Sequence, residues 1–269
     1  AASHGSQRWI SIGPFSLQPS ELAKIGIILF LAAYISSKSR EMRQWKKMVI
    51  PFLFAIPIIV IVGIENLSTC IILLAISFIM IFVATPLLVP FVVIGLIGVA
   101  GAGGLLLTQG YRMERITVWL DPAASEKGHQ TIQGLYAIGS GGLFGKGLGQ
   151  SMQKLGFLPE ANNDMIFSVI CEELGLFGAL CVLALFFALI WRFMVIAVNA
   201  PDLYGSMIVV GVIAHIGIQV FINIAVATNT IPNTGIPLPF ISYGGSSLVF
   251  MLLEMGLVLS VSRYINVKK

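Results

Sequence analysis

Long apolar runs alternate with short polar segments along this chain. Seven runs predict membrane-crossing helices, of which the first is shorter than the stretch of about 20 apolar residues that spans a hydrocarbon core of about 30 Å and is expected to be tilted or extended into the flanking segment. They cover residues 21–36, 48–65, 67–84, 88–107, 165–191, 206–228 and 246–263. The pattern therefore predicts an all-α fold, a polytopic membrane helix bundle with about seven transmembrane helices.

The composition supports a membrane protein. Hydrophobic residues make up 57% of the 269 residues and charged residues only 10%, so the chain cannot supply the polar surface of a soluble domain of this size. The net charge of +4 comes mainly from short basic clusters, which are typical of membrane proteins and argue against nucleic acid as a partner. Cys70, Cys171 and Cys181 lie in apolar runs without the spacing of metal ligands or disulfides.

Basic residues in the short links predict the orientation of the bundle. They gather on one side of a seven-helix arrangement, at Lys38, Arg40, Arg43, Lys46, Lys47, Arg192, Arg263, Lys268 and Lys269. Because Lys and Arg are enriched in cytoplasmic loops, this side is predicted to be cytoplasmic. The N-terminal segment, the loop 108–164 and the loop 229–245 are then predicted to face outward.

The loop 108–164 is too long for a simple connection. Its apolar insertions, Ile116–Leu120, Ile132–Ile138 and Leu143–Phe144, predict short re-entrant or interfacial helices. The glycine-rich stretch "GSGGLFGKG" at 139–147 lacks the spacing and the preceding strand of a phosphate-binding loop. We interpret its glycines as tight turns at the membrane surface.

An acidic segment connects this loop to the next apolar run. "FLPEANNDMIFSVICEELG", residues 157–175, contains Glu160, Asp164, Glu172 and Glu173 and no basic residue. Asp164 stands where a helix begins, so a helix N-cap is one interpretation of it and a catalytic carboxylate is the other. Glu172 and Glu173 lie about 12 Å further along the helix. Because carboxylates are costly inside a membrane, both should find a donor, and one of them is expected to line a cavity.

Two more polar segments lie on the outward side. In "GSQRWISIGPFSLQPSELAK", residues 5–24, Glu21 and Lys24 are three residues apart and share a helix face. "NTIPNTGIPLPFISYGGSS", residues 229–247, is rich in Pro and Gly. Such irregular backbone occurs near a membrane where it is buried in protein or lines a wet cavity. Together with the long loop, these segments predict an outward-facing cavity with an acid at its rim.

Two further ionisable residues lie inside apolar runs. His215 is interpreted as a packed hydrogen-bonding residue rather than a proton relay. Glu254 is expected to have a buried partner, because an isolated carboxylate in a transmembrane helix is costly.

The polar segments resemble those of the SEDS family, to which RodA, FtsW and SpoVE belong. The likeness rests on "GSQRWISIGPFSLQPSELAK", "AIGSGGLFGKGLGQSMQKLGFLPEANNDMIFSVICEELG" and "GIPLPFISYGGSS". It spans the chain in order and is closest on the FtsW/SpoVE side. The resemblance implies a single SEDS-type integral membrane domain over residues 1–269. Family members have ten transmembrane helices, so the chain is expected to lack the first three and to be incomplete at its N-terminus.

The resemblance also implies roles for particular residues. The family's essential aspartate falls on Asp164, which makes this residue the expected catalytic group and 108–164 the loop that bears the active site. The family's "PSE-x-x-K" motif places Glu21 and Lys24 at the cavity. One departure is Asn66, which stands where the family commonly has Asp and puts the role of that aspartate in doubt.

The activity implied by the family is that of a peptidoglycan glycosyltransferase, which polymerises lipid II on the outer face of the bacterial plasma membrane. In such a reaction a carboxylate acts as general base on the acceptor hydroxyl, and positive charge assists the departure of the undecaprenyl diphosphate. The family's paired arginines fall on Arg112 and Arg115, while Lys146 and Lys154 could supply further charge or equally well contact lipid headgroups. A divalent cation, Mg²⁺ or Mn²⁺, is the other source of charge, and no other cofactor is expected. Substrate contacts are also expected from Glu172, Ser242 and Tyr243.

Two other functions fit the same features. The polar cavity is compatible with a transporter that flips lipid II, and the chain could also be a non-catalytic scaffold that recruits a penicillin-binding protein. A flippase should need polar groups through the depth of the membrane, whereas the candidates here gather on the outward side. A scaffold needs no acid there. The favoured interpretation is therefore an enzyme that acts with a class B penicillin-binding protein in division, elongation or sporulation.

Overall fold

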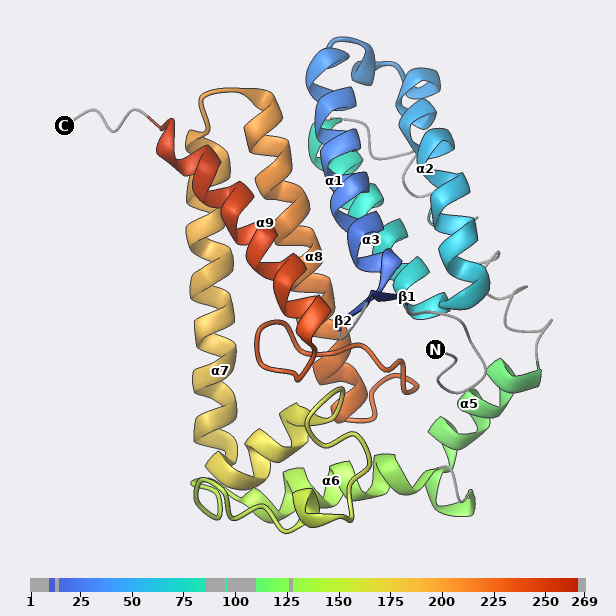
Figure 1. The fold of residues 1–269 in the computed structure, drawn as a ribbon, viewed down its shortest axis with the longest axis vertical. Coiled ribbons are helices and arrows are strands. Elements are labelled where there is room, and N and C mark those ends of the chain that lie inside the picture. The colour runs from blue at the N-terminus through green and yellow to red at the C-terminus, as the bar shows by residue number, and fades with distance from the viewer. Residues whose placement is uncertain (1–9, 13–14, 86–94, 96–109, 126–127, 266–269) are drawn as a thin grey trace. The chain divides into compact units, whose positions relative to one another are not determined.

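The structure, a computed structural model, describes all residues except 1–9, 13–14, 86–94, 96–109, 126–127 and 266–269. Six helices in this part of the chain are long and apolar enough to cross a membrane. They are α1 (Pro19–Ser37), α2 (Trp45–Glu65), α3 (Leu67–Ala84), α7 (Ile166–Asn199), α8 (Leu203–Ala227) and α9 (Gly245–Arg263) (Figure 1). Each coincides with a predicted run, and the prediction of an all-α membrane protein is confirmed. The predicted helix at 88–107 falls almost wholly outside the described residues.

Shorter elements occupy the segments between these helices. They are the strands β1 (Ile10–Ile12) and β2 (Phe15–Leu17), which pair antiparallel, the helices α5 (Gly110–Leu120) and α6 (His129–Gly141), and the 3-10 turns η1 (Glu41–Arg43), η2 (Pro122–Ala124) and η4 (Gln153–Leu155). Helices α5 and α6 contain two of the three apolar insertions of the long loop. The prediction of a helix at the third insertion is wrong. Leu143 and Phe144 lie in a loop after α6, with 65% and 80% of their surface exposed.

The chain divides into two compact units, and each is described by itself. The first unit contains residues 1–92, 189–218 and 244–269, and the second contains residues 93–188 and 219–243. The boundary between the units therefore falls within α7 and again within α8, so each of these helices has one part in the first unit and one part in the second.

In the first unit, α1 packs against α2, α3 and α9. Its core contains Ile28 and Leu31 of α1 with Ile76 and Met80 of α3, all of them fully buried. Gly211 of α8 approaches this core so closely that a Cβ there would lie 2.6 Å from Ile28 and 3.0 Å from the sulfur of Met80. A small residue is needed at this position, as is common where transmembrane helices meet.

The break between α2 and α3 falls at Asn66. Its side-chain oxygen accepts a hydrogen bond from the backbone N–H of Thr69 at 3.2 Å, so Asn66 is the N-cap of α3. An N-cap satisfies one of the N–H groups that the first turn of a helix leaves free. The residue that departs from the family pattern therefore has a structural role in this chain.

Two pairs of ionisable residues are buried in the first unit. The ammonium group of Lys24 lies 2.9 Å from the carboxylate of Glu21, one helical turn earlier in α1. His215 of α8 contacts the carboxylate of Glu254 in α9 through Nδ1 at 2.9 Å, and both residues are almost fully buried. This contact confirms the prediction that Glu254 has a buried partner and agrees with a packing role for His215.

Candidate active site

Asp164 belongs to the second unit and lies in the turn before α7. Helix α7 begins at Ile166, so Met165 occupies the position before the helix and Asp164 does not stand at the N-cap. The side chain of Asp164 instead faces α6, where the amide nitrogen of Gln130 lies 3.4 Å from each of its two carboxylate oxygens. Only 8% of the residue is exposed. The carboxylate is thus held inside the unit by contacts that a helix cap would not need.

A chain of amide groups continues from Gln130. The oxygen of its side chain accepts a hydrogen bond from the side-chain nitrogen of Asn233 at 3.1 Å. The side-chain oxygen of Asn233 accepts from the backbone N–H of Gly235 at 3.1 Å, and its backbone oxygen accepts from Arg115 of α5 at 3.1 Å. The carboxylate is therefore connected, through two side-chain amides, to both α5 and the loop 229–245.

The backbone around Asp164 is held by the same loop. The buried side chain of Asn223, in α8, donates to the backbone oxygen of Asp164 at 2.8 Å and to that of Ile236 at 2.9 Å. Ser242 donates from its hydroxyl to the backbone oxygen of residue 163 at 2.6 Å, and the N–H of Tyr243 donates to the oxygen of residue 162 at 2.8 Å. Three consecutive backbone oxygens, at 162, 163 and 164, are thereby fixed.

Burial raises the pKa of Asp164 from 3.8 to about 6. The neighbouring negative charge of Glu160 adds to this rise, whereas the hydrogen bond from Gln130 and the positive charge of Arg115 oppose it. A carboxylate with this pKa is ionised at neutral pH but accepts a proton more readily than an exposed aspartate. Such a group suits general-base catalysis.

A glycine keeps the space beside this carboxylate free. Gly235 has a φ of +66°, and a Cβ at this position would lie 4.0 Å from Oδ2 of Asp164 with no other neighbour within that distance. A larger side chain would therefore point at the carboxylate. The left-handed backbone conformation also favours glycine over other residues.

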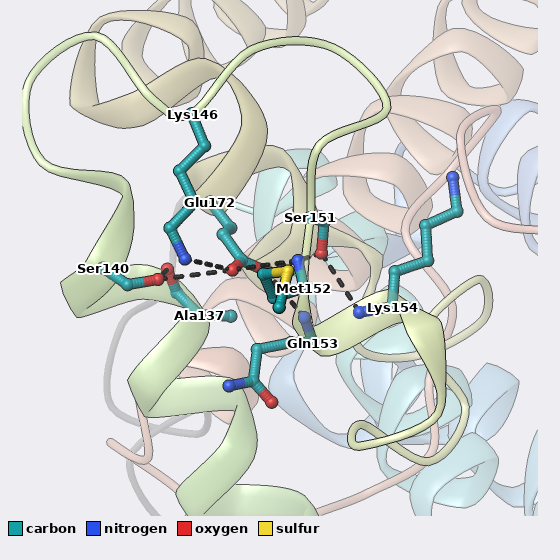
Figure 2. Close-up of polar contacts among 8 residues, drawn as sticks. All are labelled: Ala137, Ser140, Lys146, Ser151, Met152, Gln153, Lys154 and Glu172. Atoms are coloured by element: carbon teal, nitrogen blue, oxygen red, sulfur yellow. Dashed lines mark hydrogen bonds and ion pairs between the residues drawn. The ribbon is translucent and has the colours of Figure 1, made fainter.

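Glu172 is the centre of a second polar cluster, which Figure 2 shows. It is fully buried, and its carboxylate receives hydrogen bonds from Lys146 at 2.6 Å and from the hydroxyl of Ser151 at 2.5 Å. Longer hydrogen bonds come from the hydroxyl of Ser140 and from the backbone N–H groups of Met152 and Gln153. One buried carboxylate thus ties the end of α6 and the loop 146–153 to α7.

Helix α7 is interrupted next to this cluster. Gly175 has a φ of +69° and a ψ of −168°, which no helical residue has. Four backbone hydrogen bonds join the preceding loop to the interrupted turn: Lys146 N–H to Glu172 O, Gly147 N–H to Glu173 O, Leu176 N–H to Gly142 O and Phe177 N–H to Leu143 O. The loop 142–147 therefore supplies the partners that the broken helix lacks, as membrane helices require.

The glycines of this loop make that pairing possible. Gly142, Gly145 and Gly147 all have positive φ, which confirms the interpretation of the glycine-rich stretch as tight turns. A Cβ on Gly145 would lie 2.2 Å from the backbone oxygen of Glu173 and 2.6 Å from the backbone nitrogen of Gly175. Only glycine allows the two backbones to approach so closely.

The other predicted site residues are dispersed. Lys154 is exposed, and Figure 2 shows its side chain pointing away from Glu172. The side chain of Tyr243 is 82% exposed, next to the engaged backbone of Ser242. Arg112 lies in α5, with its side chain outside the described part. Glu21 and Lys24 belong to the first unit, which is described by itself.

Sequence reasoning missed Gln130, Asn223 and Asn233 as parts of the site. A signal was present for one of them, because His215, Gln219 and Asn223 recur at four-residue intervals in an apolar run and therefore share a helix face. The side chain of Gln219 donates to the backbone oxygen of Pro237 at 2.9 Å, so it also holds the loop 229–245.

The described residues contain no group of three or more His, Cys, Asp or Glu side chains arranged to hold a metal ion. The expectation of a divalent cation near the diphosphate therefore finds no ligand set among them, and stays a prediction about the enzyme with its substrate.

Comparison with known sequences places these features in context. The model of a family of cell cycle proteins, FtsW/RodA/SpoVE, matches residues 1–267. The stage V sporulation protein E of Bacillus subtilis (strain 168) is 48% identical over 267 residues, which cover 97% of this chain and 72% of that protein. A probable peptidoglycan glycosyltransferase FtsW of Geobacter sp. (strain M18) is 37% identical over 262 residues, which cover 96% of this chain and 71% of that protein.

Solved structures have a similar fold. A chain from a peptidoglycan synthase complex, described in a study of how polymerization and crosslinking are coordinated, superposes with a TM-score of 0.80 at 27% identity and covers 99% of this chain and 76% of its own. The rod shape determining protein RodA of Thermus thermophilus superposes with a TM-score of 0.67 at 28% identity and covers 99% of this chain and 72% of its own.

Proposed function

The chain belongs to the FtsW/RodA/SpoVE family of cell cycle proteins, and from this premise we propose that it is a peptidoglycan glycosyltransferase whose general base is Asp164. The observation that carries the proposal is the state of this carboxylate. It is buried and held by Gln130, and its pKa is raised to about 6, so it is ionised at neutral pH and able to take a proton.

The proposed reaction joins two lipid-linked sugars. Asp164 removes the proton from a hydroxyl of the acceptor sugar as the oxygen attacks the anomeric carbon of the donor. The new C–O bond forms while the bond from that carbon to the lipid diphosphate breaks, and the diphosphate leaves with its electron pair. Proton removal by a positioned carboxylate contributes about 10²–10⁴-fold to such rates. The donor and acceptor are proposed to be lipid II and an undecaprenyl-diphosphate-linked glycan.

Positive charge near the leaving group is proposed to come from Arg112, Arg115 and Lys154. Arg115 is the best supported of these, because its charge already influences Asp164. Lys146 is engaged with the fully buried Glu172, so we propose that this pair holds the loop 142–153 in place and that only Lys146 contacts the substrate from that position. Tyr243 is exposed beside the turn of Asp164 and is proposed to contact the substrate directly.

Three further residues of the predicted substrate site also have internal partners. Ser242 uses its hydroxyl for the turn before Asp164, and Glu21 and Lys24 form a buried ion pair. We propose that Ser242 acts on the substrate site indirectly, by holding the backbone of the turn that carries Asp164. For Glu21 and Lys24 we propose substrate contacts on the family resemblance alone.

The active face is proposed to be extracytoplasmic. The basic link 38–47 then lies in the cytoplasm, in agreement with the positive-inside rule. Single cysteines at the exposed positions Ser39 and Gln150 test this, in a background without the exposed Cys181. A membrane-impermeant thiol reagent should label Gln150→Cys in intact spheroplasts and Ser39→Cys only after lysis. The opposite pattern would place the active site in the cytoplasm.

A class B penicillin-binding protein is the proposed partner. The support is the similarity to a chain of a peptidoglycan synthase complex, in which polymerization and crosslinking are coordinated. The two activities would then act on the same strand in succession.

The decisive experiment measures glycan polymerisation from lipid II by the full-length protein with its partner in detergent. Asp164→Asn and Asp164→Ala should abolish polymer formation, because neither side chain accepts a proton. Asp121→Asn is the matched control, since Asp121 caps η2 with its oxygen and Asn caps about equally well. A detergent micelle has no two separate membrane faces, so translocation of lipid II cannot take place in it and cannot account for a polymer. An active Asp164→Asn enzyme, or movement of lipid II across vesicles without any polymerisation, would overturn the proposal.

A further inference from the structure

The amide group of Gln130 has a defined direction. A backbone N–H can only donate, so the bond from Gly235 makes the oxygen of the Asn233 side chain face Gly235. The nitrogen of Asn233 must then face Gln130, and it meets the amide oxygen of Gln130 at 3.1 Å. Reversing either amide would bring two like atoms together. The nitrogen of Gln130 is therefore turned toward Asp164.

The position of this nitrogen relative to the carboxylate is symmetric. It lies 3.4 Å from Oδ1 and 3.4 Å from Oδ2 of Asp164. A donor placed between the two oxygens resists rotation of the carboxylate in either direction. The distances are longer than the 2.7–2.9 Å or so that is typical of strong charge-assisted hydrogen bonds, so the contact should have a moderate effect on the ionised form.

Helix α6 holds Gln130 at this distance. A Cβ on Gly134, one turn after Gln130, would lie 2.3 Å from the terminal methyl of Met165, the residue after Asp164. The preceding residue, His129, contacts the backbone oxygen of Phe157 through Nε2 at 3.0 Å. The segment that carries Gln130 and the segment that carries Asp164 are thus packed directly against each other.

From this geometry we infer that Gln130 is a positioning residue for the reaction, which fixes the orientation of the Asp164 carboxylate and favours its ionised form. The inference rests on the proposed role of Asp164 as general base. Asn233 acts indirectly on Asp164, by fixing the direction of the Gln130 amide. The other charged groups that influence Asp164 are Glu160, in the same turn, and Arg115, from α5.

The test is the pH profile of polymerisation. Gln130→Glu keeps the size of the side chain and the acceptor for Asn233 but removes the donor, and Gln130→Met removes the donor without adding charge. In both variants the ionised carboxylate loses support, so the acidic limb of the profile should move to higher pH. A shift of about one pH unit lowers activity about fivefold at pH 6 and less than about twofold at pH 8. Gln130→Glu should shift the limb at least as far as Gln130→Met, because it also adds a like charge.

Two more variants complete the experiment. Gln150→Glu makes the same change at an exposed glutamine of the same unit and should leave the profile unmoved. Asn233→Asp keeps the acceptor for Gly235 and removes the donor to Gln130, so it should shift the limb in the same direction even if the Gln130 variants fold poorly.

The two proposals fail in different ways. If Asp164→Asn is inactive but folded Gln130 and Asn233 variants lose activity equally at every pH, Gln130 only packs, and the inference is wrong. If Asp164→Asn retains activity, the proposed function is wrong, and the inference falls with it. A moved acidic limb in the Gln130 variants, with the limb of Gln150→Glu unmoved, supports both.

Discussion

The side-chain amide of Asn223 donates a hydrogen bond to the backbone oxygen of Asp164, 59 residues earlier in the chain, at 2.8 Å. The same nitrogen donates to Ile236 at 2.9 Å, and Asn223 is fully buried. One amide group therefore joins α8, the turn of Asp164 and the loop 229–245. Because buried carbonyl groups are costly when unpaired, the position of the carboxylate depends on a residue that does not touch it.

Replacing Asn223 by Asp should disrupt this junction. The new carboxylate would face two backbone oxygens and offer neither a donor, and each unpaired group costs about 1–3 kcal/mol. We expect a lower melting temperature and loss of polymerisation. Asn199→Asp is the control, because Asn199 donates to Val195 at an exposed helix end. Equal melting temperatures for both variants would show that the junction contributes nothing to stability.

Asp164→Asn should stabilise the protein while it abolishes activity. The folded state raises the pKa of Asp164 from 3.8 to about 6, so this carboxyl group favours folding at low pH, and its contribution is lost as the pH rises toward 6. At pH 8 the ionised, buried group costs up to about 3 kcal/mol, which Asn avoids. Thermal unfolding at pH 8 and pH 5 should show a gain that is larger at pH 8. A variant less stable than the parent at pH 8 would contradict the raised pKa.

The two partners in the Glu172 cluster should respond unequally to substitution. Glu172→Ala leaves Lys146, two hydroxyls and two backbone N–H groups without this acceptor, and we expect a loss of about 3 kcal/mol or more. Lys146→Met leaves Glu172 with its neutral donors, so the loss should be smaller. Limited proteolysis of the loop 142–158, together with thermal unfolding, measures both. A larger effect of Lys146→Met would mean that the ion pair outweighs the neutral hydrogen bonds.

Gly175→Ala should be among the most damaging single-methyl changes in the chain. The added Cβ would lie 2.3 Å from the backbone nitrogen of Gly145, at a φ of +69° that alanine avoids. Gly139→Ala in α6 is the control, because a Cβ there meets nothing within 4 Å and alanine favours a helix. We expect the folded yield of Gly175→Ala in detergent to collapse and that of Gly139→Ala to be unchanged. A well-folded Gly175→Ala protein would refute the close approach of loop and helix.

The buried contact between His215 and Glu254 should behave as a unit. Removing one partner leaves a polar group unpaired in an apolar bundle, so His215→Leu or Glu254→Leu alone should cost about 3–5 kcal/mol. The double variant should recover much of the loss, because apolar residues of similar volume often replace a buried pair well. Thermal unfolding of all four proteins gives the coupling energy. Additive losses would mean that the two residues act independently.

Hydropathy is sufficient to predict the six described helices that are long and apolar enough to cross a membrane, because each must cover its backbone with an apolar surface. The largest error is at the end of α7, which was expected at residue 191 and lies at Asn199. The predicted end rests on Arg192, which interrupts the apolar run in the sequence. A long basic side chain can extend toward the membrane surface from within a helix, so the helix continues past it.

The candidate site was predictable only in part. Asp164 was identified because its motif resembles that of a known family. Gln130 and Asn233 carry no comparable signal, since amides are common in loops. They become part of the site through a contact that joins residues 103 positions apart. Such pairings arise from the tertiary fold, which local sequence patterns do not encode.

The backbone pairing at Gly175 also bears on how the chain enters the membrane during its synthesis. The interrupted turn cannot satisfy its own hydrogen bonds in lipid, so it needs the loop 142–147 before it can settle there. This loop precedes α7 in the sequence and has therefore left the ribosome when α7 is made. The order of translation supplies the partner before the broken helix requires it. A circular permutation that placed the loop after α7 would reverse this order and leave the turn exposed to lipid until the loop had been synthesised.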